Sequence, residues 1–174
     1  MTTIFLIGFM GAGKTTVGKL LAHSTQKRHL DLDVEIEKKV GQPISQIFSE
    51  QGELSFRKIE HESLKKSMDQ NAIVSTGGGI VLSASNRALL QEFSSEVIYL
   101  KTDPTVFIER LKRDTKNVRP LVTDKSVEEI SAIYLPREVL YESCANFTVN
   151  TSLYSPKEVV REILAYLNKK EQML

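Results

Sequence analysis

A glycine-rich stretch near the start of the chain, GFMGAGKTT from Gly8 to Thr16, directly follows an apolar run. It fits the pattern G-x-x-x-x-G-K-[S/T] between a strand and a helix, with Lys14 at the lysine position and Thr15 after it. Glycines let successive backbone N–H groups point at phosphate oxygens, and the N-terminus of the following helix favours an anion. In this pattern the lysine reaches the β- and γ-phosphates and the hydroxyl binds Mg²⁺. The residues predicted to contact a nucleotide are therefore Gly11, Ala12, Gly13, Lys14, Thr15 and Thr16.

Two aspartates, Asp31 and Asp33, stand at the end of the short stretch HLDLD. If the strand runs through both, alternation points their side chains to the same side, at the carboxyl edge of a parallel sheet where ligands bind. One carboxylate is then expected to serve the water shell of the metal, and the other an acceptor hydroxyl. The alternative is that the pair caps the next helix, VEIEKK, a role that for Asp33 is compatible with catalysis.

Arginines supply positive charge at three places farther along the chain. Arg57 lies one helical turn before Glu60 in GELSFRKIE, where it is either a surface cation paired with Glu60 or a planar fork for a carboxylate ligand. Arg119 precedes a proline, and Arg137 stands in YLPREVLY. Phosphoryl transfer needs positive charge on the transferring oxygens, so these arginines are candidates for that task or for holding an acid.

A run of glycines ends another predicted strand, in STGGGI from Ser75 to Ile80. Glycines remove side chains where a ligand must approach the backbone. A plain loop is the alternative, but such a loop rarely requires consecutive glycines.

Short apolar segments rich in β-branched residues must carry these groups, and they predict buried strands at Ile4–Ile7, His29–Asp33, Ile73–Ser75, Val97–Leu100 and Asn146–Asn150. Apolar residues at helical spacing lie between them, and the clearest stripe runs from Val159 to Leu167 behind Ser155-Pro156 as cap and first turn. The alternation of strands and helices predicts an α/β fold, with a parallel sheet covered on both faces.

One stretch, RDTKNVRPLVTDKS from Arg113 to Ser126, is polar and has little periodicity. Long loops without secondary structure are usually functional or disordered in compact domains, so we interpret this one as a lid.

Length and composition describe an ordinary globular chain of 174 residues, which is enough for one domain. The formal net charge of +1 gives no reason to expect nucleic acid or an anionic membrane surface as partner. Cys144 is the only cysteine, so we expect a packed thiol rather than a disulfide or a metal cluster. The apolar N-terminus is too short to span a membrane, and we interpret it as the first strand of a cytoplasmic protein.

Taken together and in this order, the motifs GFMGAGKTT, DLDVEIE, GELSFRKIE, STGGGI, RPL and LPREVLY resemble those of the shikimate kinases. The phosphate loop alone identifies only a nucleotide-binding class, whereas the combination is much more specific. The resemblance implies a P-loop NTPase fold with a five-stranded parallel sheet, helices on both faces and a mobile lid. It also implies a single kinase domain over residues 1–174, with an acceptor-binding segment at about 32–62 and the lid at about 112–125.

The resemblance further implies ATP-dependent phosphorylation of the shikimate 3-hydroxyl, with ATP and Mg²⁺ as cofactors. Nothing in the sequence demands more than a monomer, so we expect one. Asp33 would hold the ring hydroxyls and assist proton removal, and Asp31 would support the magnesium shell through water beside Thr15. Arg57 and Arg137 would clamp the carboxylate, helped by a backbone N–H of Gly78. Lys14 and Arg119 would contact the transferring phosphate, Arg119 from the lid.

Two points stay open in the sequence. Arg110, Lys112 and Arg113 are equally placed to stack on adenine, and the segment LYS before Pro156 offers no clear contact to the nucleobase.

Another hydroxy-acid kinase, such as a gluconate kinase, is an alternative function. It would also use an arginine pair, although DLD and GELSFRKIE favour shikimate. A non-catalytic nucleotide-binding module is the third alternative, and the acceptor-binding residues argue against it.

Overall fold

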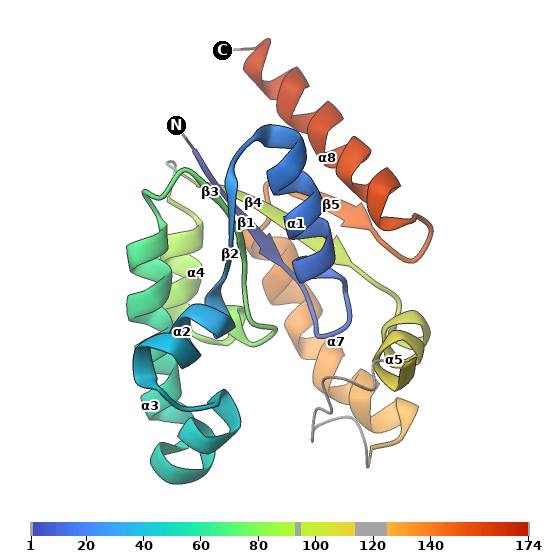
Figure 1. Ribbon diagram of the computed structural model, residues 1–174. Coiled ribbons are helices and arrows are strands. Elements are labelled where there is room, and N and C mark those ends of the chain that lie inside the picture. The colour runs from blue at the N-terminus through green and yellow to red at the C-terminus, as the bar shows by residue number, and fades with distance from the viewer. Residues whose placement is uncertain (1, 93–94, 114–124, 174) are drawn as a thin grey trace.

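The computed structural model describes residues 2–92, 95–113 and 125–173 (Figure 1). Its strands are β1 Thr3–Ile7, β2 Arg28–Asp31, β3 Ala72–Ser75, β4 Ser95–Lys101 and β5 Phe147–Asn150. They form one five-stranded sheet in the order β2-β3-β1-β4-β5, and every pairing is parallel. The predicted parallel α/β fold is confirmed.

Helices cover both faces of this sheet, and each face has its own core. On one face lie α1 (Lys14–Thr25) and α8 (Pro156–Glu171). On the other lie α2 (Leu32–Val40), α3 (Ile44–Ser67), the 3₁₀ turn η1 (Ile80–Leu82), α4 (Ala84–Leu90), α5 (Pro104–Arg113) and α7 (Val127–Cys144).

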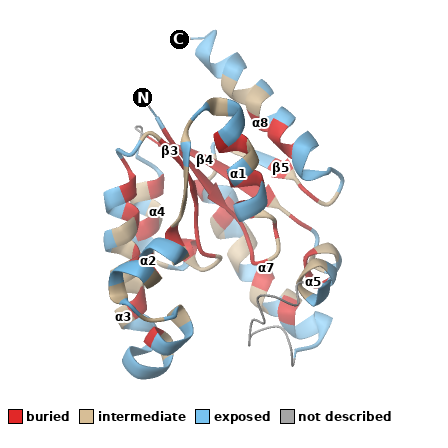
Figure 2. Cartoon of the chain, viewed as in Figure 1, coloured by how far each residue is buried: buried red, intermediate tan, exposed pale blue. Residues whose placement is uncertain are grey.

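Strand alternation divides the apolar residues between the two cores. In β1, Phe5 and Ile7 join the core under α2 to α7, whereas Ile4 and Leu6 join the core under α1 and α8. All residues of β1 and β3 are buried, as a parallel sheet covered on both faces requires (Figure 2).

The carboxyl ends of β1, β2 and β3 meet at one edge of the sheet, opposite the edge near which the chain termini lie (Figure 1). β1 leads into the glycine-rich loop, β2 into α2, and β3 into the glycine run. The strands on either side of β1 are β3 and β4, so the chain switches direction across the sheet there. Ligands of open α/β sheets bind at such a switch point.

Helix α7 did not emerge from the sequence as an amphipathic stripe, for a physical reason. Its buried residues include Ile130, Tyr134 and Tyr141, but Leu135 and Val139 are apolar and exposed. Apolar residues thus surround the helix, which therefore shows no clear periodicity. A capping box formed by Ser126 and Glu129 starts the helix.

Candidate active site

The glycine-rich loop curls around its own lysine. The Lys14 ammonium donates hydrogen bonds to the carbonyl oxygens of Gly8 (2.7 Å) and Phe9 (2.9 Å), and the side chain is buried. Gly13 is the N-cap of α1 with φ 94°, a left-handed conformation that residues with a side chain seldom adopt. The loop and the first turn of α1 therefore present backbone N–H groups and a lysine at the end of β1, which suits phosphate.

Thr15 and Asp31 face each other across the loop. The Thr15 hydroxyl donates to Oδ2 of Asp31 at 2.9 Å. A hollow of about 250 Å³ opens beside the pair, lined also by Lys19, His29 and Glu35. Hydroxyl and carboxylate oxygens are ligands that Mg²⁺ accepts directly or through water.

The predicted strand through both aspartates is wrong. β2 ends at Asp31, whose side chain accepts a hydrogen bond from the Val34 N–H (3.4 Å) and so caps α2. Because the cap starts the helix at Leu32, Asp33 lies in the first helical turn. Asp31, rather than the pair, therefore fills the capping role.

Asp33 nevertheless reaches the sheet edge, where it contacts the glycine run. A Cβ added to Gly77 would lie 2.8 Å from Oδ1 of Asp33, so only glycine allows this approach. A Cβ at Gly78 would lie 3.3 Å from the backbone N of Met10 in the phosphate loop, and one at Gly79 would collide with the Arg57 guanidinium. The glycine run thus touches α2, the phosphate loop and α3 in turn.

Arg57 is held by two carboxylates of α3. Its Nη1 donates to both oxygens of Glu60 (2.9 and 2.8 Å), and its Nη2 donates to Glu53 (3.2 Å). The Arg57 side chain is 17% exposed and that of Glu60 only 1%, whereas that of Glu53 is 59% exposed. The predicted pairing with Glu60 is confirmed, but Arg57 is no freely solvated surface cation.

A buried polar network continues behind Glu60. Asn86 in α4 is fully buried, and its Nδ2 donates to Glu60 (3.2 Å) and to the Ile80 carbonyl (3.1 Å). His61 completes the network with a hydrogen bond to Oδ1 of Asn86 (2.9 Å). Burial raises the pKa of the Glu60 carboxyl, while the neighbouring Arg57 charge lowers it.

Arg137, on α7, reaches the phosphate loop from a distant part of the chain, because α7 packs beside that loop. Its guanidinium lies over the ring of Phe9 in the phosphate loop, 5.6 Å from the ring centroid. One turn farther along α7, the Tyr141 hydroxyl donates a hydrogen bond to the Gly78 carbonyl. The structure therefore brings Asp33, Arg57, Gly78 and Arg137 together beside the phosphate loop.

Arg119 and most of the predicted lid lie outside the described residues. Of the three cations before it, Arg110 is the one that bridges the phosphate loop to the segment after β5. It donates to the Thr151 carbonyl at 2.8 Å and to the Gly11 carbonyl at 3.5 Å. Arg113 instead pairs with Glu109 on the same helix.

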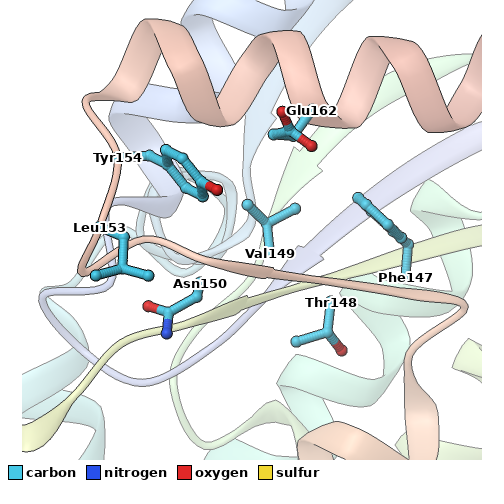
Figure 3. Close-up of a pocket in the computed structure, with 7 residues that line it drawn as sticks. All are labelled: Phe147, Thr148, Val149, Asn150, Leu153, Tyr154 and Glu162. Atoms are coloured by element: carbon cyan, nitrogen blue, oxygen red, sulfur yellow. The ribbon is translucent and has the colours of Figure 1, made fainter.

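A second hollow, also of about 250 Å³, lies between the edge strand β5 and α8 (Figure 3). Phe147 and Val149 point toward α8, from which Glu162 faces them, while Leu153 and Tyr154 border the same space from the turn. The described residues that line this hollow include none of the predicted site residues.

Three findings concern the part of the chain that the structure describes. No group of three or more His, Cys, Asp or Glu side chains in it is arranged to hold a metal ion. Cys144 is a buried thiol there, as expected, and burial raises its pKa. Within residues 2–92, 95–113 and 125–173, no helix has the length and apolarity needed to cross a bilayer.

Sequence reasoning missed three residues that contact the site residues: Glu53, Asn86 and Tyr141. Glu53 and Tyr141 each stand four residues from an arginine that was singled out, so helical spacing was an available signal for both. Asn86 had no such signal, because it meets Glu60 only through the packing of α4 against α3.

Comparisons with known proteins identify the family of this chain. The family model described as shikimate kinase matches residues 10–168. A shikimate kinase of Enterococcus faecalis is 44% identical over 169 residues, covering 97% of this chain and all of that protein.

Solved structures are similar to this fold as well. A shikimate kinase from Acinetobacter baumannii, solved in complex with shikimate, superposes with a TM-score of 0.88 at 35% identity, over 98% of this chain and 94% of that one. A gluconokinase from Sinorhizobium meliloti reaches a TM-score of 0.61 at 18% identity, over 97% of this chain and 92% of that one, which shows a shared fold alone. The chain described here belongs to the shikimate kinase family.

Proposed function

We propose that this protein transfers the terminal phosphoryl group of ATP to the 3-hydroxyl of shikimate, giving shikimate 3-phosphate and ADP. The observation that carries the proposal is the glycine run, which contacts Asp33, the phosphate loop and Arg57 within three consecutive residues. An acceptor beside this run would lie next to a carboxylate, a guanidinium and the loop that suits phosphate. Such a reaction depends mainly on positioning and charge neutralisation.

ATP is proposed to bind with its phosphates on Gly11 to Thr16. Lys14, which now donates to loop carbonyls, would turn to the β- and γ-phosphates when they are present. The nucleobase would lie near Arg110, the cation that bridges the loop and Thr151. Arg119 is proposed to contact the transferring phosphate.

Magnesium would be held by the Thr15 hydroxyl directly and by Asp31 through water. The donor set fits, because Mg²⁺ is usually bound by one or two protein oxygens together with substrate phosphates and water. When bound, the ion would neutralise charge on the β- and γ-phosphates.

The acceptor is proposed to bind through both of its polar ends. Asp33 would accept a hydrogen bond from the reacting hydroxyl and take its proton as transfer proceeds. Arg57 and Arg137, with the Gly78 N–H, would hold the carboxylate. Since Glu53 is exposed while Glu60 is buried, the carboxylate would displace Glu53 from Arg57 and leave the Glu60 pair intact.

The activity is tested by ADP release from the purified protein with ATP and Mg²⁺, with shikimate or gluconate as acceptor. We expect turnover with shikimate and no rate above background with gluconate. Chelation of Mg²⁺ should abolish turnover. Faster turnover of gluconate would assign the site to another hydroxy acid, and no turnover with either acid would leave only a nucleotide-binding role.

We further propose that the enzyme acts as a cytoplasmic monomer on these small molecules, without nucleic acid or membrane as partner.

A Gly79→Ala substitution should raise the KM for shikimate by at least about tenfold and leave the KM for ATP within about twofold. The new methyl group would collide with the Arg57 guanidinium and push the fork out of place. Steady-state kinetics with each substrate varied in turn measures both constants. An equal rise of the two KM values would instead indicate a general distortion of the sheet edge.

A further inference from the structure

Tyr141 is a buried residue to which the proposed mechanism gives no task, although its hydroxyl meets the acceptor site. The side chain is fully buried in the core under α7. Its hydroxyl donates a hydrogen bond to the Gly78 carbonyl, which joins α7 to the loop after β3. This is a long-range tie between two elements that each carry a proposed acceptor contact, Arg137 and Gly78.

The ring of Tyr141 is held rigidly on its other side. It stacks on Tyr99 of β4, with ring centroids 5.1 Å apart and an interplanar angle of 23°. The Tyr99 hydroxyl in turn forms a hydrogen bond with that of Tyr134, which lies two turns before Tyr141 on α7, at 3.0 Å. The hydroxyl of Tyr141 is therefore presented from a fixed ring.

Two arginines of the proposed site act electrostatically on this hydroxyl. Burial raises the pKa of Tyr141, and the positive charges of Arg137 and Arg57 act in the opposite direction, Arg137 also through hydrogen bonding. Tyr141 thus stays a protonated donor to the Gly78 carbonyl at neutral pH.

The Gly78 peptide needs an external constraint. Glycine has the widest choice of backbone conformation, so three consecutive glycines do not hold a loop in one shape by themselves. Because the peptide bond is planar and trans, a hydrogen bond to the Gly78 carbonyl also directs the Gly79 N–H, which points the opposite way in the same plane. The bond to Tyr141 therefore directs the backbone donor that follows the Gly78 N–H proposed to contact the acid.

We propose that Tyr141 is a positioning residue for the acceptor's carboxylate: it orients the peptide between Gly78 and Gly79, and Arg137, without touching the acid. The proposal rests on the function proposed above, since it assumes that this carboxylate binds between Arg57, Arg137 and the glycine run. Phenylalanine would fill the same space in the core, so packing alone does not explain the hydroxyl. The proposal explains it by the hydrogen bond that joins α7 to the loop after β3.

The test compares Tyr141→Phe with Tyr99→Phe. Both variants keep a buried ring in the same stacked pair, but only the first loses the bond to Gly78. We expect Tyr141→Phe to raise the KM for shikimate about tenfold, with the KM for ATP and kcat within about threefold of wild type. Tyr99→Phe should leave the KM for shikimate within about twofold of wild type, even if its melting temperature falls as much as that of Tyr141→Phe.

The outcomes separate this inference from the function on which it rests. Normal wild-type turnover with an unchanged KM for shikimate in Tyr141→Phe would overturn the positioning role alone. An equal rise in Tyr99→Phe would reduce the effect to core packing. Absence of wild-type turnover with shikimate would overturn the proposed function first.

A measurement on the wild-type protein needs no variant to fold. Shikimate added without nucleotide should shift the NMR resonances of the Tyr141 ring together with the Gly78 and Gly79 amides, and leave those of the Tyr166 ring, which stacks on Phe147 at β5, in place. Unshifted Tyr141 resonances at saturating shikimate would contradict the proposal.

Discussion

Replacing Asp33 by Asn should lower kcat for shikimate phosphorylation by about a thousandfold, while the affinity for ATP stays within about twofold. An amide has nearly the shape of a carboxylate but cannot take the proton of the acceptor hydroxyl. Asp33 lies in the first turn of α2 against Gly77 and is not one of the residues proposed to hold the phosphates, so nucleotide binding should persist. Single-turnover kinetics measures the chemical step, and calorimetric titration with ATP measures affinity.

Glu62→Gln provides the matched control for this substitution. Glu62 is an exposed residue of α3 and is not one of the proposed site residues. The control makes the same change of carboxylate to amide on the helix that packs against α2. Equal loss of turnover in both variants, or normal turnover in Asp33→Asn, would remove Asp33 from the chemical step.

Replacing Arg57 by Ala should have two separable effects, of which the first is a rise of about a hundredfold or more in the KM for shikimate. The acid would lose a fork that donates two parallel hydrogen bonds. The second effect is on stability, because removal of one partner leaves the Glu60 carboxylate buried without its counter-charge. We expect a loss of roughly 3 kcal/mol in the free energy of unfolding. Arg57→Lys, which keeps the charge but not the fork, should restore only part of the acceptor binding.

Adding Glu60→Gln to Arg57→Ala separates these effects. The double variant should recover most of the lost stability, since no buried charge remains, but none of the shikimate affinity. In Arg57→Ala alone, burial would raise the pKa of Glu60 further, because the opposing charge of Arg57 would be gone. A carboxyl whose pKa is raised in the folded state binds more protons there than in the unfolded state, so the stability deficit should shrink as the pH falls from 7 to about 5. Recovery of shikimate affinity in the double variant would contradict the carboxylate-binding role of Arg57.

Local chemistry allowed the phosphate loop and the Arg57–Glu60 pair to be predicted. The glycine-rich pattern specifies both a backbone path and its ligand within nine residues, and a spacing of three on a helix makes two side chains neighbours. The strands were predicted for a similar reason, because short β-branched runs between helical patterns are typical of a buried parallel sheet.

The aspartates were predicted in the wrong element because the boundary depends on a single side chain. Asp31 caps α2, and this turns the chain from extended to helical one residue before Asp33. Alternation and helix geometry place Asp33 differently, and the sequence alone did not choose between them. Its contact with Gly77 instead follows from the closeness of α2 to the loop after β3.

Tertiary packing accounts for what the sequence could not give. Asn86 reaches Glu60 from another helix, and Tyr141 reaches Gly78 across 63 residues of chain. The order β2-β3-β1-β4-β5 likewise depends on long-range pairing. Such contacts have no local period, so neither spacing nor composition indicates them.

The close approach of Gly78 to Met10 limits how the acceptor range of this enzyme could be redesigned. The backbones of the two loops lie so near that even one methyl group at position 78 would press on the loop beneath it. Mutant libraries aimed at bulkier or differently charged acids would therefore disturb the phosphate loop if they varied Gly78. Substitutions at Glu53, an exposed residue of α3, would leave the contact between Gly78 and Met10 intact.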